Sequence, residues 1–269
     1  MCISVLISIY DGEKPQLFQS AMESIWDHQT LKPKEIVLVK DGGLNTELEK
    51  ITHDWKEKLG DKLKVVSLPK NAGLAKALNE GMKHCSCDLV ARMDTDDISM
   101  PQRLEIQFDF MEKNPDIAVS SGFIKEIDKN GKTVSVRKLP LTHEELITFA
   151  RTRSPVSHAA AIFRKSAVLA VGGYPPFKKA QDHALWSVML LNGYKFANVD
   201  AVLYAVPVNG DFFKKRGFSH LVHELAIIRY QRKIGFIGFS DFVKNIIIRV
   251  TIRLSPTIIK KIFYKYARG

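Results

Sequence analysis

Short β-branched runs alternate with helical periodicity through the first hundred residues. The apolar runs occupy residues 2–9, 36–39, 63–68 and 89–93. Around them, apolar side chains recur at the spacing of one helix face, in stretches at 15–28, 45–59, 73–84 and from Pro101 onward. The first of these helices is expected to reach His28, with that side chain on its inner face. The alternation is typical of βαβ units, and it predicts four of them by Asn114.

Beyond residue 114 the pattern loosens. Expected there are a strand-and-turn pair at 117–127, a hairpin turn at 129–132 with a returning strand at 134–138, helices at 141–150 and 181–191, a strand at 159–163, and a strand before Lys214. Three helical stretches then follow, at 218–234, 239–254 and 256–267, in which Leu, Ile, Phe and Val are interleaved with Arg and Lys. The chain therefore divides into a domain at 1–210 and a basic amphipathic extension at 211–269.

Positive charge is concentrated in that extension. The net charge is +11, and residues 211–269 hold 13 Lys and Arg against 3 Asp and Glu, whereas residues 1–210 are nearly balanced. An acidic membrane surface and nucleic acid are the usual partners of such a segment. The Ile-rich helices show no stacking aromatics of a nucleic-acid module, so an anionic membrane surface is predicted and no nucleic acid. The other interpretation is that the helices pack on the domain.

Three cysteines, Cys2, Cys85 and Cys87, form no disulfide or zinc framework in the sequence. They predict a reduced, cytoplasmic protein. No secretory signal precedes the first strand, and no window reaches roughly 18 uncharged apolar residues. The expectation is a protein that does not cross a membrane but lies peripherally on the inner face of the cell membrane.

Acidic residues follow three of the predicted strands. Asp11 follows the first, Asp41 the second, and Asp94, Asp96 and Asp97 the fourth. Parallel strands deliver these residues to one edge of the sheet, where ligands of doubly wound folds bind. Crowded carboxylates select Mg²⁺ or Mn²⁺, which complete their shell with phosphate oxygens of a nucleotide diphosphate. The alternative is a solvated acidic turn that caps the next helix.

The segment from Asp94 to Leu104, with the strand before it, resembles the D-x-D segment of inverting family 2 glycosyltransferases. Further segments match in the expected order at 4–10, 24–30, 35–42, 71–79, 172–174 and 181–186. The resemblance covers residues 1–210. It implies the α/β class with a GT-A fold, in which a mixed, mainly parallel sheet is flanked by helices.

The resemblance also implies roles for individual donor-side residues. These are Ser8, Tyr10 and Asp41 around the nucleotide base, Asn71, Gly73 and Asn79 along the donor pocket, Asp94 at the ribose or the metal, and Asp96 on the metal. The implied donor is a uridine diphosphate sugar. The sequence departs from the family in two places, because Lys40 stands where a first acid is common and Gly43 where Ser is common.

Asp182 corresponds to the catalytic base of the family. An inverting transfer needs one carboxylate, which takes the proton of the acceptor hydroxyl while the metal stabilises the departing diphosphate. The alternative is that Asp182 only caps its helix. His158 lies in a segment that the family places near the acceptor, although a lone His beside an apolar strand is often structural. Residues 214–216, Lys-Lys-Arg, are either a loop that closes over the diphosphate or a solvated charge run.

Together these features predict a metal-dependent inverting enzyme that moves glucose or galactose from a UDP-sugar. Its acceptor is expected to be GlcNAc or GalNAc on a lipid diphosphate, as in bacterial O-antigen or capsule assembly. One alternative is a phosphohydrolase that uses Asp94 and Asp96, and another is a non-enzymatic nucleic-acid or membrane binder. A dinucleotide-dependent oxidoreductase is excluded because no G-x-G-x-x-G follows the first strand.

Overall fold

A computed structural model describes residues 2–208 and 218–254. Its strands are β1 (Ile3–Ile9), β2 (Glu35–Lys40), β3 (Leu63–Ser67), β4 (Leu89–Met93), β5 (Ile98–Ser99), β6 (Ile117–Ile127), β7 (Thr133–Arg137), β8 (Ile162–Arg164) and β9 (Lys195–Pro207). In the described residues they form one sheet in the order β3-β2-β1-β4-β8-β6-β9-β5, with β7 paired to β6. Strands β1 to β4 are mutually parallel, whereas β8, β5 and β7 each run antiparallel to a neighbour. The sheet is thus mixed, with a parallel first half.

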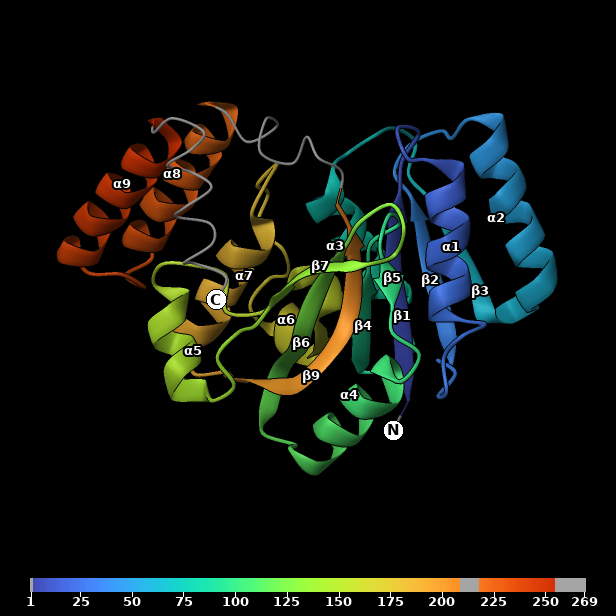
Figure 1. Ribbon diagram of the computed structural model, residues 1–269, viewed down its shortest axis with the longest axis horizontal. Coiled ribbons are helices and arrows are strands. Elements are labelled where there is room, and N and C mark those ends of the chain that lie inside the picture. Colours follow the sequence, from blue (N-terminus) through green and yellow to red (C-terminus); the bar gives the residue numbers. More distant parts are fainter. Residues whose placement is uncertain (1, 209–217, 255–269) are drawn as a thin grey trace.

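Helices cover both faces of this sheet (Figure 1). They are α1 (Pro15–Ile25), α2 (Thr46–Leu59), α3 (Leu74–His84), α4 (Arg103–Lys113), α5 (His143–Ala150), α6 (Lys165–Ala170), α7 (Gln181–Leu191), α8 (Phe218–Lys233) and α9 (Phe239–Leu254), with short 3₁₀ turns at Gly60–Lys62 and His158–Ala160. Pro15 begins α1, Asn45 caps α2 through the amide of Leu48, and Thr142 with Glu145 forms a capping box on α5.

The alternation of side chains along the strands divides the core into two layers. Val5 and Ile7 of β1 pack with α1, α2 and α4, whereas Leu6 between them packs with α3, α5 and α7. Successive residues of a strand point to opposite faces, so a strand buried on both faces is apolar throughout. Strand β1 is of this kind, and its carboxyl end is therefore held from both sides.

The amino ends of the parallel strands carry a satisfied buried acid and a disulfide. The Glu35 carboxylate accepts hydrogen bonds from Ser4 Oγ at 2.6 Å and from the Ser86 amide, and it pairs with Lys64 at 2.7 Å. Beside it, Cys2 and Cys87 are joined by a disulfide with their Cα atoms 5.5 Å apart.

The expectation of three reduced cysteines is therefore wrong for Cys2 and Cys87, and only Cys85 is a free, buried thiol. The pairing of β1 with β4 aligns Ile3 with Leu89, which brings together cysteines 85 residues apart in the chain. The spacing of the cysteines along the sequence does not indicate that Cys2 and Cys87 lie close together.

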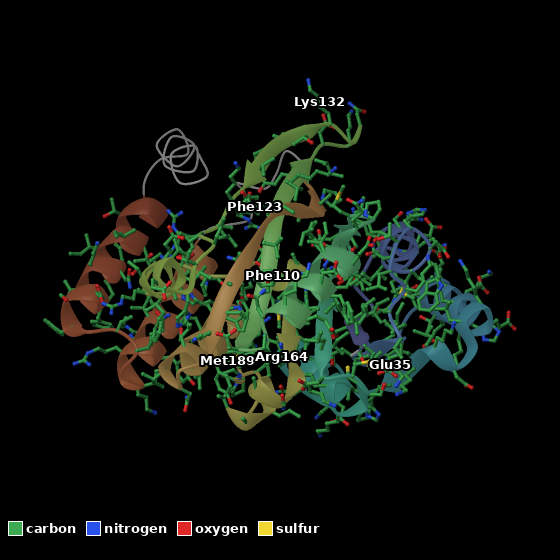
Figure 2. All side chains as sticks on the ribbon, turned by 90° about the horizontal axis from the view of Figure 1, so that it is seen from below. Glu35, Phe110, Phe123, Lys132, Arg164 and Met189 are labelled. Atoms are coloured by element: carbon green, nitrogen blue, oxygen red, sulfur yellow. A yellow bond between two sulfur atoms is a disulfide. The ribbon has the colours of Figure 1, made fainter. Side chains whose placement is uncertain are left out.

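The second half of the chain differs from the expected elements in several places. Residues 117–127 form one continuous strand instead of a strand and turn. Helix α1 ends at Ile25, and His28 beyond it is exposed rather than on an inner face. The hairpin of β6 and β7 is as expected, and Figure 2 shows its tip, marked by Lys132, projecting from the body of the molecule.

Helices α8 and α9 pair with each other and lie at one end of the molecule, beside α5 and α7 (Figure 1). No helix within the described ranges has the length and apolar character needed to span a bilayer. The expected helix at 256–267 and the basic residues 214–216 lie outside the described residues.

Candidate active site

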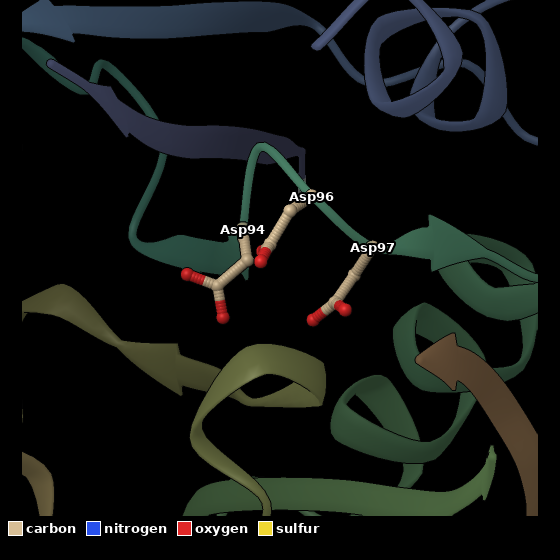
Figure 3. A group of neighbouring side chains, drawn as sticks. All are labelled: Asp94, Asp96 and Asp97. Atoms are coloured by element: carbon tan, nitrogen blue, oxygen red, sulfur yellow. The ribbon is translucent and has the colours of Figure 1, made fainter. Parts of the chain in front are cut away.

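Three carboxylates converge between β4 and β5. One oxygen from each of Asp94, Asp96 and Asp97 lies within 4.8 Å of the others, and Figure 3 shows the side chains projecting into the same space. Asp96 is exposed, Asp94 is half-buried and Asp97 is buried. An oxygen-only group of this kind suits a hard divalent cation.

Distant parts of the chain hold the acidic segment in place. Strand β5 pairs with β9, which aligns Ser99 with Tyr204. The amide of Asp94 donates to the Tyr204 hydroxyl at 3.0 Å, and Asp97 shares a hydrogen bond with the same hydroxyl. Burial of Tyr204 raises its pKa, and the charges of Asp97 and Asp94 raise it further. The phenol therefore stays protonated and can serve as a fixed anchor.

A buried arginine pair lies directly beneath the cluster. Arg92 is 2% exposed and forms an ion pair with Asp94. Arg103 donates to the Arg92 carbonyl at 2.6 Å and lies over the ring of Tyr204, 5.0 Å from its centroid. Burial lowers the pKa of Arg103 to about 10, which still leaves the guanidinium charged at neutral pH. Asp94 is thereby compensated, whereas within residues 2–208 and 218–254 neither Asp96 nor Asp97 forms an ion pair with an arginine.

The remaining acids of the cluster repel one another. Burial raises the pKa of Asp97. The Asp96 side chain is exposed overall, but its carboxyl group is partly surrounded by protein, and this desolvation raises its pKa as well. The charge of Asp94 raises both pKa values further. Glu13 behaves in the same way, because burial and then the charge of Asp96 raise its pKa. Glu13 was not predicted, although its position just after the first strand was an available signal. Carboxylates that disfavour their own ionisation are the arrangement that a bound cation relieves.

Asp41 is buried and holds the turn before α3. Its two carboxylate oxygens accept from the amides of Ala72 at 2.6 Å and Gly73 at 2.9 Å. Gly42 has φ +94°, and a side chain there would meet the Asn71 amide at 2.8 Å. Lys40, the departure from the family pattern, is paired with Glu49 of α2. The Lys40 ammonium thus points toward α2, and the Asp41 carboxylate makes its hydrogen bonds with the backbone amides of the 71–73 turn.

The other donor-side residues lie along the same edge of the sheet or behind it. Ser8 is half-buried near the end of β1, Tyr10 just beyond is 44% exposed, and Asn71 is exposed. The Asn79 side-chain amide makes two hydrogen bonds with the backbone of Tyr174, at 2.8 and 2.9 Å. In this structure Asn79 holds the turn that carries Gly173, whose backbone leaves no room for a side chain.

Asp182 lies in the first turn of α7. It is half-buried, and Ser154 Oγ donates to its Oδ2 at 3.2 Å. The residue before the helix, Ala180, has φ +57°, a left-handed conformation that costs a non-glycine residue about 1 kcal/mol. Strained backbone of this kind often lies at functional sites.

Tyr174 lies within electrostatic range of both Asp94 and Asp182. Burial raises its pKa, and the charges of Asp182 and Asp94 both add to the increase while Arg92 opposes it. The hydroxyl hydrogen-bonds His158 Nε2 at 3.0 Å, and His158 packs edge-on against Trp186. Burial lowers the pKa of His158, so it is neutral at physiological pH. Within the described residues, its ring contacts the side chains of Tyr174 and Trp186.

The comparison with protein families decides the class. The model described as "Glycosyl transferase family 2" matches residues 4–172, more than half of the chain. The protein belongs to glycosyl transferase family 2. The resemblance drawn from the sequence is thereby confirmed, and so is the prediction of an enzyme that transfers glycosyl groups.

Two bacterial relatives of this glycosyltransferase align over almost all of its length. It is 36% identical to the amylovoran biosynthesis glycosyltransferase AmsE of Erwinia amylovora, over 98% of both chains. It is 34% identical to the UDP-Gal:alpha-D-GlcNAc-diphosphoundecaprenol beta-1,3-galactosyltransferase of Escherichia coli, over 97% of this chain and 94% of that one. Both alignments extend into the basic C-terminal helices.

Solved structures confirm the GT-A fold of the glycosyltransferase. Mannosyltransferase PcManGT from Pyrobaculum calidifontis, in complex with GDP-Man and Mn2+, aligns with a TM-score of 0.65 at 17% identity, over 99% of this chain and 75% of that one. S. aureus TarS 1-349 in complex with UDP-GlcNAc aligns with a TM-score of 0.63 at 21% identity, over 86% of this chain and 66% of that one. At these identities the likeness concerns the fold.

Family membership also decides between the alternatives left open by the sequence. A phosphohydrolase with a nucleophile at Asp94 or Asp96 is not supported, since the match to a glycosyltransferase family spans the motif. A wholly non-enzymatic binder is excluded for the same reason.

Proposed function

We propose that the protein is a metal-dependent, inverting glycosyltransferase that moves a hexose from a UDP-sugar to a lipid-diphosphate-linked sugar. The observation that carries the proposal is the convergence of Asp94, Asp96 and Asp97 within 4.8 Å in a chain of this family. Asp182 supplies the separate carboxylate that the chemical step needs. The neighbourhood of Tyr174, which feels the charges of both Asp94 and Asp182, supports a shared site.

Asp96 and Asp94 would hold Mn²⁺ or Mg²⁺. The residues fit such an ion, because the donor atoms are all oxygens. Desolvation first, and the charge of Asp94 second, raise the pKa of Asp96 and Asp97, and a bound cation would oppose both effects. When bound, the ion would stabilise the negative charge of the departing diphosphate. Arg92 beneath Asp94 limits the excess negative charge and keeps that carboxylate in place.

The nucleotide would lie along the carboxyl ends of β1 and β2. Ser8 and Tyr10 would frame the base together with Asp41. Asp41 already fixes the 71–73 turn through the Ala72 and Gly73 amides, so its effect on the donor would include the shape of this turn. Asn79 would act on the donor pocket from behind, through the turn at Tyr174.

Asp182 would act as the general base. Its carboxylate takes the proton of the acceptor hydroxyl while that oxygen attacks the anomeric carbon from the face opposite the diphosphate. The bond to the diphosphate breaks as the new glycosidic bond forms, so configuration inverts and UDP leaves. One base is sufficient for this step, which accords with the structural supporting role of neutral His158.

The names of the two relatives support a galactose donor and a lipid-linked acceptor. The Escherichia coli relative is named for UDP-Gal and GlcNAc-diphosphoundecaprenol, and the Erwinia relative for amylovoran biosynthesis. We therefore place galactose before glucose, and GlcNAc before GalNAc as the acceptor sugar. The pathway class is assembly of a bacterial surface polysaccharide, O-antigen or capsule.

The outward face of α9 would bind an anionic membrane at the inner surface of the cell. Its exposed apolar side chains are Phe239, Val243, Ile247 and Ile248. Lys244 lies among them, and the segment 211–269 carries an excess of ten positive charges, which complements anionic headgroups. Vesicle flotation of the Phe239→Asp/Ile247→Asp variant tests this, with Val134→Asp as the control for an exposed apolar residue elsewhere. Oligonucleotide binding without flotation of the wild type would contradict the assignment.

The proposal is tested by UDP release with a synthetic GlcNAc-diphospho-lipid and a panel of UDP-sugars. UDP-galactose is expected to give the highest rate, and linkage analysis of the product should show inversion. Asp182→Asn should keep the donor Kd and lower kcat by about 10²- to 10⁴-fold. The matched control is Asp200→Asn, an exposed position in β9. Wild-type turnover in Asp182→Asn would remove this residue as the base.

A further inference from the structure

Buried polar side chains join the C-terminal helices to the segment that presents Asp182. Gln231 of α8 and Asn245 of α9 are 1% and 3% exposed, although both belong to helices outside the family match. Buried amides of this kind are rare unless their hydrogen bonds are satisfied. Their partners show what these two residues hold in place.

Helix α9 holds the turn that follows α5. Asn245 Nδ2 donates to the carbonyl of Arg151 at 2.7 Å, and Arg249 donates to the carbonyl of Thr152. Two residues further along, Ser154 donates to the Asp182 carboxylate. Residues 151–154 therefore link α9 to the candidate base. Their first two carbonyls accept hydrogen bonds from α9, and Ser154 at the other end donates to Asp182.

Helix α8 holds α7 itself. The Gln231 amide nitrogen donates to Ser187 Oγ at 2.8 Å and lies 3.0 Å from Nε2 of His183, the residue next to Asp182. His183 Nε2 in turn donates to the Ala150 carbonyl at 2.9 Å. One buried amide thus contacts the first two turns of α7 and the end of α5.

The start of α7 needs external support. Ala180 adopts a left-handed conformation and offers no side-chain cap to the helix amides. A catalytic group keeps its geometry only when neighbouring contacts fix the element that carries it. In this structure those contacts come from α5, α8 and the 151–154 turn.

We propose that the α8–α9 pair is a positioning element of the active site, in which Gln231 and Asn245 act through Asp182. The proposal rests on the assignment of Asp182 as the base. The C-terminal helices then serve the chemical step as well as the membrane surface, and a chain cut before α8 would bind the donor but transfer poorly. The hydrogen bonds of the Gln231 and Asn245 side chains described above are all with protein groups of α7 and the 150–151 backbone, so their effect is expected on kcat.

The test measures kcat, the donor Kd and thermal unfolding in Gln231→Leu and Asn245→Ala of the full chain. At temperatures below the unfolding transition of each variant, kcat is expected to be at least tenfold lower than in the wild type. The Kd for UDP-galactose is expected to be unchanged. Arg229→Ala, an exposed change on α8, is the control. A second readout is the combination with Asp182→Asn, where Gln231→Leu should lower the residual rate no further.

The outcomes separate the two assignments. Wild-type kcat in both Gln231→Leu and Asn245→Ala would overturn the positioning role, and so would an equal further loss in the Asp182→Asn background. Wild-type turnover in Asp182→Asn alone would instead overturn the base assignment. If Gln231→Leu does not fold, Asn245→Ala carries the same test, because it removes one of the two hydrogen bonds from α9 to the 151–154 turn without changing a contact of α7.

Discussion

Carboxyl groups at the two ends of the parallel strands have pKa values shifted in opposite directions. At the amino ends, burial alone would raise the pKa of Glu35, but hydrogen bonds from Lys64, Ser4 and Ser86 lower it to about 2. At the carboxyl ends, burial and mutual repulsion raise the pKa of Asp96 and Asp97. The carboxylate at the amino ends therefore has hydrogen-bonding partners that stabilise its charge, whereas the charges of the carboxylates at the carboxyl ends are destabilised.

This difference separates Glu35, an acid with a structural role, from Asp96 and Asp97, the acids that we propose lie at a cation site. A satisfied carboxylate contributes to the free energy of unfolding and has no remaining demand for a partner. An unsatisfied cluster costs stability in the free protein and recovers it when a cation binds. We therefore predict that substitutions at the carboxyl ends change turnover and metal dependence, whereas substitutions at the amino ends change the free energy of unfolding.

The largest expected effect is on turnover in Asp96→Ala. The loss of this carboxylate should lower kcat about a thousandfold, ~4 kcal/mol of barrier, and abolish the dependence of rate on Mn²⁺. The free energy of unfolding without metal should stay the same or rise, since repulsion is relieved. UDP release over a Mn²⁺ titration measures the first and urea unfolding the second. Asp109→Ala, on the exposed side of α4, is the control, and retained metal dependence in Asp96→Ala would contradict the site.

Glu35→Gln should show the opposite pattern, with a loss of stability and normal turnover. Because the folded pKa of about 2 lies below the ordinary 4.5, the stabilisation is complete above about pH 4.5 and disappears as pH falls toward 2. That displacement sets an upper bound of about 3 kcal/mol at neutral pH, which solvent screening at the 42% exposed Lys64 reduces. Urea unfolding of wild type and variant between pH 7 and pH 2 measures it, and the two curves should converge at the acid end. A constant difference across this range would contradict the assignment.

The smallest effect is the stabilisation by metal in the absence of substrate. At a Mn²⁺ concentration of a hundred times Kd, the unfolding free energy should rise by about 2.7 kcal/mol. The raised pKa values of Asp96 and Asp97 mean that protons compete with the ion, so the gain should grow as pH increases from acid to neutral. Thermal unfolding with and without Mn²⁺ measures this effect. An equal gain in Asp96→Ala would show that the ion binds elsewhere.

The sequence predicts the acidic edge well because strand ends are local features. Asp41, Asp94 and Asp96 each follow an apolar run, and parallel pairing brings them to one edge. Arg92 and Tyr204 were missed, since one lies within an apolar strand and the other lies 110 residues from the amide that it anchors. Contacts between residues far apart in the chain produce no periodic pattern in a single sequence, so they could not be predicted from it.

The same limit explains the errors in the second half of the fold. The two-residue strand β5 and the bounds of β9 depend on their pairing with each other, about a hundred residues apart. His28 was placed on an inner face because the periodicity continues past Ile25, where the helix ends. The Cys2–Cys87 disulfide likewise follows from strand order and not from cysteine spacing.

The pairing of β5 with β9 has a consequence for biosynthesis. The acidic segment 94–97 is made early, yet Tyr204 and the β9 edge that fix it are made roughly a hundred residues later. A nascent chain can close the parallel strands first and still lack an ordered donor site. The proposed donor site is therefore ordered only after β9 has paired with β5, about a hundred residues after the acidic segment itself has been made.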